Sequence, residues 1–360
     1  MEKAIRIKLN RLAIVFCMAL LVFLFGLNSK WVERLYSDGL YPYTSMAQRA
    51  ISSVLPFALG DFLYMILVAF CLWSIYKVAR LAIAGQMDKQ AIKINLIKLV
   101  NFILLAYVIF KLLWGLNYSR PSISQRLGIN DQKYNTKELI QLGDFLIRRI
   151  NTIQQQVAQQ KLSHAYTVKQ LEQQSKMAYD HMARRNPFFN YHVPAVKPVL
   201  FSWLISKIGI EGYYCPPSGE ANLNMRLPAM VLPFVSCHEI SHQLGVARED
   251  EANLVGYLVS THSANFRFQY SGTYEILRSV LFEIRLKSPE DFQLLYKKIN
   301  AGTLADFRAE RQFWMEYNGD MSAYMNTALD KFLKINNQTK GTDSYQDIVL
   351  WVFNLHKREL

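Results

Sequence analysis

Three long apolar runs in the first third of the chain constrain its fold more than any other feature. They cover about residues 12–27, 57–76 and 99–116. Each approaches the roughly 17–25 residues that a helix needs to cross a bilayer, so we expect three transmembrane helices. Basic residues precede the first run, as in a signal peptide. However, residues 28–31 (Asn-Ser-Lys-Trp) supply no small-residue cleavage site, and we expect a retained anchor.

The basic residues that flank these runs predict an orientation. Four of them precede the first run and five lie between the second and third, whereas the longer segment between the first and second carries only three. The positive-inside rule therefore places the N-terminus and the second loop in the cytoplasm. We expect a multi-pass protein of the cell membrane. Residues 1–117 would form its membrane domain, and residues 118–360 would form an extracytoplasmic domain.

The net charge of +13 does not by itself indicate a nucleic-acid partner. The basic residues collect at the ends of the apolar runs, where anionic lipid and topology favour them. No basic motif with interleaved aromatic residues, typical of nucleic-acid modules, is present. We therefore expect the lipid bilayer as a partner and nucleic acid as none.

The four cysteines do not predict a metal site of their own. No Cys-x-x-Cys pair is present, so a zinc site made of cysteines alone is not expected. Cys215 and Cys237 would need a specific geometry to form a disulfide, and two free thiols are the favoured interpretation.

The chain after residue 117 is polar and amphipathic, and we expect it to be mostly helical. Thr136 is a plausible N-cap for a helix through about Gln160, and Thr167 for one that Pro187 ends. Residues 213–224 are rich in turn formers and predict a turn with a short strand beside it. The expected fold class is thus mainly α: three N-terminal transmembrane helices, then a zincin-like metallopeptidase domain with a small β element.

The segment 238–242 reads His-Glu-Ile-Ser-His and carries the predicted chemistry. Two histidines four residues apart project from one face of a helix, so His238 and His242 can bind one zinc ion. Glu239 then lies beside the open coordination position, where it can take a proton from the attacking water and pass it to a leaving amine. Pro233 suits the first helical turn and Gly245 suits a C-cap.

A zinc site of this kind needs a third protein ligand. One peptidase pattern places a third histidine at position 248, but Arg248 cannot coordinate zinc. A second pattern uses a glutamate on the following helix, with Asp or Asn four residues later. Glu249 and Asn253 have that spacing, and Glu251 is the alternative. Acidic residues are also favoured in the first turn of any helix, so Glu249 is a preference and not the only candidate.

The sequence leaves two further roles undecided, the binding of the substrate backbone and the stabilisation of an oxyanion. Residues 220–224 could form an edge strand that binds the substrate backbone. A side chain that stabilises an oxyanion is also needed, and no spacing rule selects it. The candidates are Arg248, Tyr213, Tyr214 and Tyr257.

Segments spread over nearly the whole chain resemble an uncharacterised bacterial membrane family with three N-terminal spans and a zinc-peptidase-like domain. These segments are residues 33–37, 55–60, 114–118, 218–222, 238–253 and 332–334. The sequence Glu-Asp-Glu-Ala-Asn at 249–253 is also similar to the Glu-x-x-Ala-Asp/Asn helix of gluzincin-type membrane peptidases. That resemblance implies Glu249 as the third ligand, with Asn253 where many gluzincins have Asp.

We therefore expect a membrane-anchored, zinc-dependent metallopeptidase that hydrolyses a peptide or protein substrate. Its Zn²⁺ ligands would be His238, His242 and Glu249, and Glu239 would be the general base. The alternative is a catalytically inactive zinc-binding sensor or peptide-binding scaffold at the membrane. Loss of activity with zinc retained in Glu239→Gln would separate the two.

Overall fold

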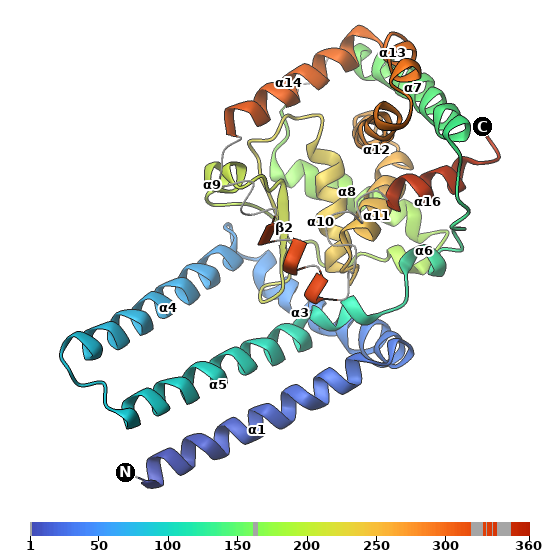
Figure 1. Cartoon of the computed structure of the whole chain (residues 1–360). Helices are drawn as coiled ribbons and strands as arrows, with labels where there is room; N and C mark the ends of the chain where they lie inside the picture. The colour runs from blue at the N-terminus through green and yellow to red at the C-terminus, as the bar shows by residue number, and fades with distance from the viewer. Residues whose placement is uncertain (1, 161–164, 318–326, 329, 333, 337–346) are drawn as a thin grey trace.

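Three long helices extend together from one side of a larger, mainly helical body (Figure 1). The computed structural model describes residues 2–160, 165–317, 327–328, 330–332, 334–336 and 347–360. Leu333, within one of the segments that carry the family resemblance, lies outside these residues.

The long helices are α1 (Glu2–Gly26), α4 (Leu59–Ile83) and α5 (Lys89–Leu113). Each contains a stretch long and apolar enough to cross a membrane, and most of its large apolar side chains are exposed. The prediction of three such helices is confirmed, although α5 ends at Leu113, before the predicted residue 116. The C-terminal ends of α1 and α5 and the N-terminal end of α4 lie against the body (Figure 1). The basic flanks of the three helices lie at their opposite ends.

The segment between α1 and α4 runs along the body. It comprises α2 (Ser29–Trp31), the π-helix η1 (Val32–Leu40) and α3 (Tyr41–Ser53). Buried aromatic residues from η1 and from the chain after α5 pack together with Tyr214 and Ala247 of the body. The division at residue 117 stays a prediction, and the packing across it is close.

Two amphipathic helices begin with capping boxes. In α7 (Thr136–Gln159) the N-cap is Asn135, one residue before the predicted Thr136, and its side chain exchanges hydrogen bonds with Glu138. In α8 (Val168–Ala183) the N-cap is Thr167, as predicted. Such caps satisfy amide groups that the first helical turn leaves without partners.

The sheet has three short strands in the order β1-β3-β2. The central strand β3 (Glu220–Leu223) pairs parallel with β1 (Val196–Pro198) and antiparallel with β2 (Gly212–Cys215). The expectation that residues 220–224 form an edge strand is wrong, because β3 has a neighbour on each side. The edge strands are β1 and β2.

The body is built around α10 (Leu232–Gln243) and α11 (Glu249–Thr261), which lie among α8, α12 (Phe266–Lys287) and the sheet (Figure 1). Their apolar residues form one large core with those of α7 and α12. The other elements are η2 (Gly115–Ser119), α6 (Ile123–Arg126), η3 (Pro187–Phe189), α9 (Ser202–Lys207), α13 (Pro289–Tyr296), α14 (Ala301–Tyr317) and α16 (Asp347–His356).

The carboxylate of Glu220 ties the sheet to the first turn of α4. Its two oxygens accept hydrogen bonds from the amides of Leu59 (2.9 Å) and Gly60 (2.6 Å) and from the hydroxyl of Ser218 (2.7 Å). A buried carboxylate is well placed there, since the first amides of a helix lack intrahelical partners and carry partial positive charge.

We expect Glu220→Gln to lower the free energy of unfolding by about 1–3 kcal/mol, because one carboxylate oxygen becomes an amide group that cannot accept these bonds. Thermal unfolding in detergent measures the effect. Glu290→Gln, at an exposed site in the first turn of α13, is the matched control and should lower the midpoint much less, because an exposed charge at a helix start stabilises only slightly. Equal midpoints for the two variants would contradict the capping role.

Candidate metal centre

Helix α10 presents His238 and His242 on one face, and both of its predicted ends are found. Pro233 lies in the first turn. Gly245 adopts a φ of +81°, a left-handed conformation that favours glycine at the end of a helix. A Cβ atom at this position would lie 3.0 Å from the Tyr41 ring and 3.1 Å from Oδ1 of Asn117. Position 245 therefore suits glycine both by conformation and by space.

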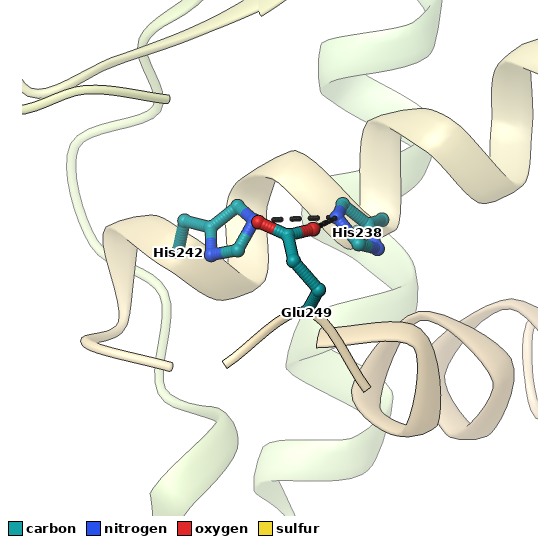
Figure 2. Close-up of side chains that lie close together, drawn as sticks. All are labelled: His238, His242 and Glu249. Carbon is teal, nitrogen blue, oxygen red and sulfur yellow. Dashed lines mark hydrogen bonds and ion pairs between the residues drawn. The ribbon is translucent and has the colours of Figure 1, made fainter. Parts of the chain in front are cut away.

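Helix α11 begins with Glu249, whose carboxylate points toward the two histidines (Figure 2). The Nε2 atoms of His238 and His242 are 3.2 Å apart, and Glu249 lies 3.2 Å from the first and 3.7 Å from the second. Ligand atoms of a tetrahedral zinc site lie about 3.3 Å apart, given zinc–nitrogen distances of ~2.0–2.1 Å. The spacing of these three side chains therefore fits a single zinc ion.

Glu251, the alternative third ligand, lies elsewhere. It is only 1% exposed, and its Oε1 accepts hydrogen bonds from the Ile123 amide (2.9 Å) and from Arg248 (3.4 Å). The structure thus brings Glu249, and not Glu251, to the histidines, while coordination of zinc by Glu249 stays a prediction.

The two imidazole rings are held in different ways. Nδ1 of His242 lies 2.6 Å from the carbonyl oxygen of Val246, which fixes the proton on Nδ1 and leaves the Nε2 lone pair facing His238 and Glu249. Nδ1 of His238 is buried and makes no short hydrogen bond among the described residues, although an interaction with the Asn253 side chain contributes to the raised pKa of this ring. The His242 ring is thereby oriented to act as a ligand through Nε2, whereas the His238 ring is held less tightly.

The electrostatics of the cluster favour a bound cation. Burial lowers the pKa of His242 to about 4. Burial also opposes charge on His238, but the hydrogen bond to Glu249 and the charges of Glu239 and Glu249 outweigh it and raise the pKa of His238 to about 9. The pKa of Glu249 is lowered, because the two histidines outweigh the effect of its burial. The Glu249 carboxylate, whose pKa is lowered, thus stabilises positive charge beside the two rings.

Glu239 lies beside the cluster and is not part of it. Burial raises the pKa of its carboxyl group to about 8, and the charge of Glu249 adds to the effect. Its Oε2 atom is buried without a hydrogen-bond partner in the described part of the chain. A Cβ atom added at Gly212 would lie 2.8 Å from its Oε1 atom, so the carboxylate fits closely against edge strand β2. A side chain at position 212 would displace it.

Residues before position 118 hold the C-terminal end of α10, which the sequence did not predict. The carbonyl oxygen of His242 accepts hydrogen bonds from Tyr41 Oη and Trp114 Nε1, both at 3.1 Å. The next carbonyl, of Gln243, accepts from Tyr41, Ser45 and Arg49. These donors satisfy groups that a helix end leaves open. Trp114 belongs to a segment that carries the family resemblance, but no spacing rule links it to His242.

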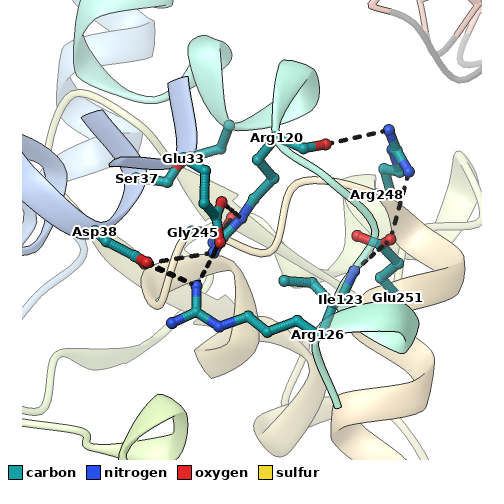
Figure 3. A network of polar contacts seen from close by, with 10 residues as sticks. Glu33, Ser37, Asp38, Arg120, Ile123, Arg126, Gly245, Arg248 and Glu251 are labelled. Carbon is teal, nitrogen blue, oxygen red and sulfur yellow. Dashed lines mark hydrogen bonds and ion pairs between the residues drawn. The ribbon is translucent and has the colours of Figure 1, made fainter. Parts of the chain in front are cut away.

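A network of charged residues holds the turn between His242 and Glu249 (Figure 3). The buried Arg120 donates two hydrogen bonds to Glu33, both 2.9 Å long, and one of 3.1 Å to the carbonyl oxygen of Gly245. Arg126 pairs with Glu33 and Asp38. Arg248 and Glu251 join the network through Arg120 and Ile123. The turn that sets the distance between the histidines and Glu249 is thereby tied to η1 and α6.

Most of the candidates for stabilising an oxyanion have other partners. Tyr257 bonds to His356, Tyr213 bonds to Asp61, and Arg248 belongs to the charged network. Tyr214 lies beside His242, with 6.5 Å between ring centroids, and its hydroxyl contacts that of Tyr41. Tyr118, which we did not predict, is buried near Glu249: burial raises its pKa, and the charge of Glu249 adds to this. The role therefore stays unassigned.

Cys215 and Cys237 are both buried free thiols. The favoured interpretation from the sequence agrees with this arrangement.

The fold and the site together define a mainly helical protein with three potential membrane-spanning helices and a partly buried His-His-Glu cluster in its body. Residues 36–353 match the model of a family described as "Protein of unknown function (DUF3810)", and the chain belongs to this family. No curated protein and no solved structure gives a significant match to the chain.

Proposed function

We propose that the chain is a membrane-anchored, zinc-dependent metallopeptidase. The observation that carries the proposal is the meeting of His238, His242 and Glu249, whose ligand atoms all lie within 4.8 Å of one another, with the carboxylate of Glu239 buried beside them. Two imidazoles and one carboxylate are a donor set that zinc hydrolases use.

In this proposal each residue has a distinct task. His238, His242 and Glu249 hold the zinc ion, which when bound acts as a Lewis acid on the scissile carbonyl group and the attacking water. Glu239 accepts a proton from that water and returns it to the leaving nitrogen. The unpartnered Oε2 of Glu239 is free among the described residues for this exchange. The edge strand β2, against which Glu239 lies, is the place where an extended peptide could pair.

The proposal is tested by incubating the purified full-length protein with zinc and a mixture of peptides, and identifying products by mass spectrometry. Cleavage that a zinc chelator abolishes and added zinc restores is expected. A zinc-loaded protein that cleaves none of the peptides would favour the alternative, an inactive zinc-binding sensor or scaffold.

We further propose that the body lies outside the cytoplasm. The basic ends of the three long helices lie away from the body (Figure 1), and basic flanks remain on the cytoplasmic side. A reporter that is active only in the cytoplasm, fused after Leu360, should therefore be silent. The same reporter fused in the loop between α4 and α5, at Gly85, is the control and should be active. Strong signal from the fusion at Leu360 would reverse the topology.

A further inference from the structure

Leu200, Phe201, Trp203 and Leu204 form an exposed apolar run at the start of α9, which we call the α9 patch. Their side chains are 44–57% exposed. Between residues 165 and 317, the other exposed large apolar side chains occur singly or in pairs. Four such residues within five positions are unusual on a surface that faces water, and they indicate contact with an apolar partner.

The α9 patch is fastened to the start of the helix α4. The amide of Leu200 donates a hydrogen bond of 2.7 Å to Asp61, in the first turn of α4, and Tyr213 of β2 bonds to the same carboxylate. Just before the patch, Lys197 donates to the carbonyl oxygens of Ser53 and Leu55. Figure 1 shows α9 beside the end of α4 that meets the body. The patch therefore lies at the level where the apolar surface of α4 begins.

The residues of α9 are also arranged as at a membrane interface. Ile205 and Ser206 are buried against the body, whereas Trp203 and Leu204 face outward. Lys207 ends the helix, with its ammonium group 5.9 Å from the centre of the Trp203 ring. Tryptophan beside lysine is typical of the boundary between lipid headgroups and acyl chains. The exposed Phe57 and Phe62 continue the apolar surface toward α4.

We propose that the α9 patch inserts into the headgroup–acyl boundary of the membrane that α4 spans. The body is then held to the bilayer at the ends of the three long helices and also through α9, which restricts its tilt relative to the membrane. The proposal concerns a lipid surface and does not depend on a metal ion at His238.

The experiment places a nitroxide label in the full-length protein. Cys17 and Cys71 are replaced by alanine, since Cys215 and Cys237 are buried, and a cysteine is introduced as Trp203→Cys. The matched control is Leu294→Cys, which is 60% exposed on α13, on the far side of the body from α4 (Figure 1). The labelled protein is reconstituted into phosphatidylethanolamine and phosphatidylglycerol vesicles, and collision rates with oxygen and with a water-soluble nickel chelate are measured by electron paramagnetic resonance.

The ratio of oxygen to nickel collisions should be severalfold higher at position 203 than at position 294, because oxygen concentrates in the acyl region and the chelate is excluded. Leu204→Cys supplies a second label position if the first variant does not fold. Ratios at 203 and 204 equal to that at 294 would overturn the proposal. It would also be overturned by labels shielded from both reagents, which would mean that protein covers the patch.

Discussion

Replacing Glu239 with glutamine is expected to give a folded, zinc-containing protein whose peptide hydrolysis is lower by about a hundredfold or more, a typical contribution of a general base. Glutamine keeps the size of the side chain that packs against Gly212 but cannot accept the proton. Because Glu239 lies beside the ligand cluster and not in it, zinc content should remain near that of the wild type. Turnover and zinc content are measured on the same preparation.

The matched control for this variant is Glu283→Gln, near the C-terminal end of α12, where the carboxylate bonds to Tyr134 and Lys287. It should keep full turnover. Wild-type turnover in a zinc-loaded Glu239→Gln protein would refute the proposed mechanism and would indicate that Glu239 has only a structural role.

Replacing Glu249 with alanine is expected to weaken zinc binding by more than about a hundredfold. Loss of a residue that only hydrogen-bonds to a metal ligand can already weaken binding by about a hundredfold, and loss of a ligand itself should cost more. The variant removes the one carboxylate that, among the described residues, lies within 4.0 Å of an imidazole nitrogen of both histidines. Zinc affinity is measured by competition with a chromophoric chelator.

Glu251→Gln is the control for the third ligand. Glu251 bonds to Ile123 and Arg248, so its replacement should lower stability while zinc affinity stays near that of the wild type. The reverse pattern, with affinity lost in Glu251→Gln and kept in Glu249→Ala, would show that the third ligand is wrongly assigned.

Local sequence patterns predicted the parts of this protein that local physics determines. The three apolar runs gave α1, α4 and α5, since length and hydropathy alone decide whether a helix can cross a bilayer. Pro233 and Gly245 gave the ends of α10, because each acts through its own backbone. The spacing of His238 and His242 predicted that they share one face of the helix, because residues four positions apart lie one turn apart.

The parts that depend on contacts between distant segments could not be predicted. Tyr41 and Trp114 reach the carbonyl oxygen of His242 across 201 and 128 residues, and no periodicity encodes such a contact. The choice between Glu249 and Glu251 likewise depends on the turn that Arg120 holds. The edge-strand expectation for residues 220–224 was wrong because strand order is set by the whole sheet and not by the strand itself.

X-ray absorption at the zinc edge tests most directly whether one zinc ion is held by two imidazoles and a carboxylate. The full-length wild-type protein is purified in detergent, supplied with zinc and passed over a desalting column. We predict about one zinc per chain, with nitrogen and oxygen neighbours at ~2.0–2.2 Å and no sulfur at ~2.3 Å. A protein that retains no zinc, or a zinc ion with sulfur neighbours, would contradict the account.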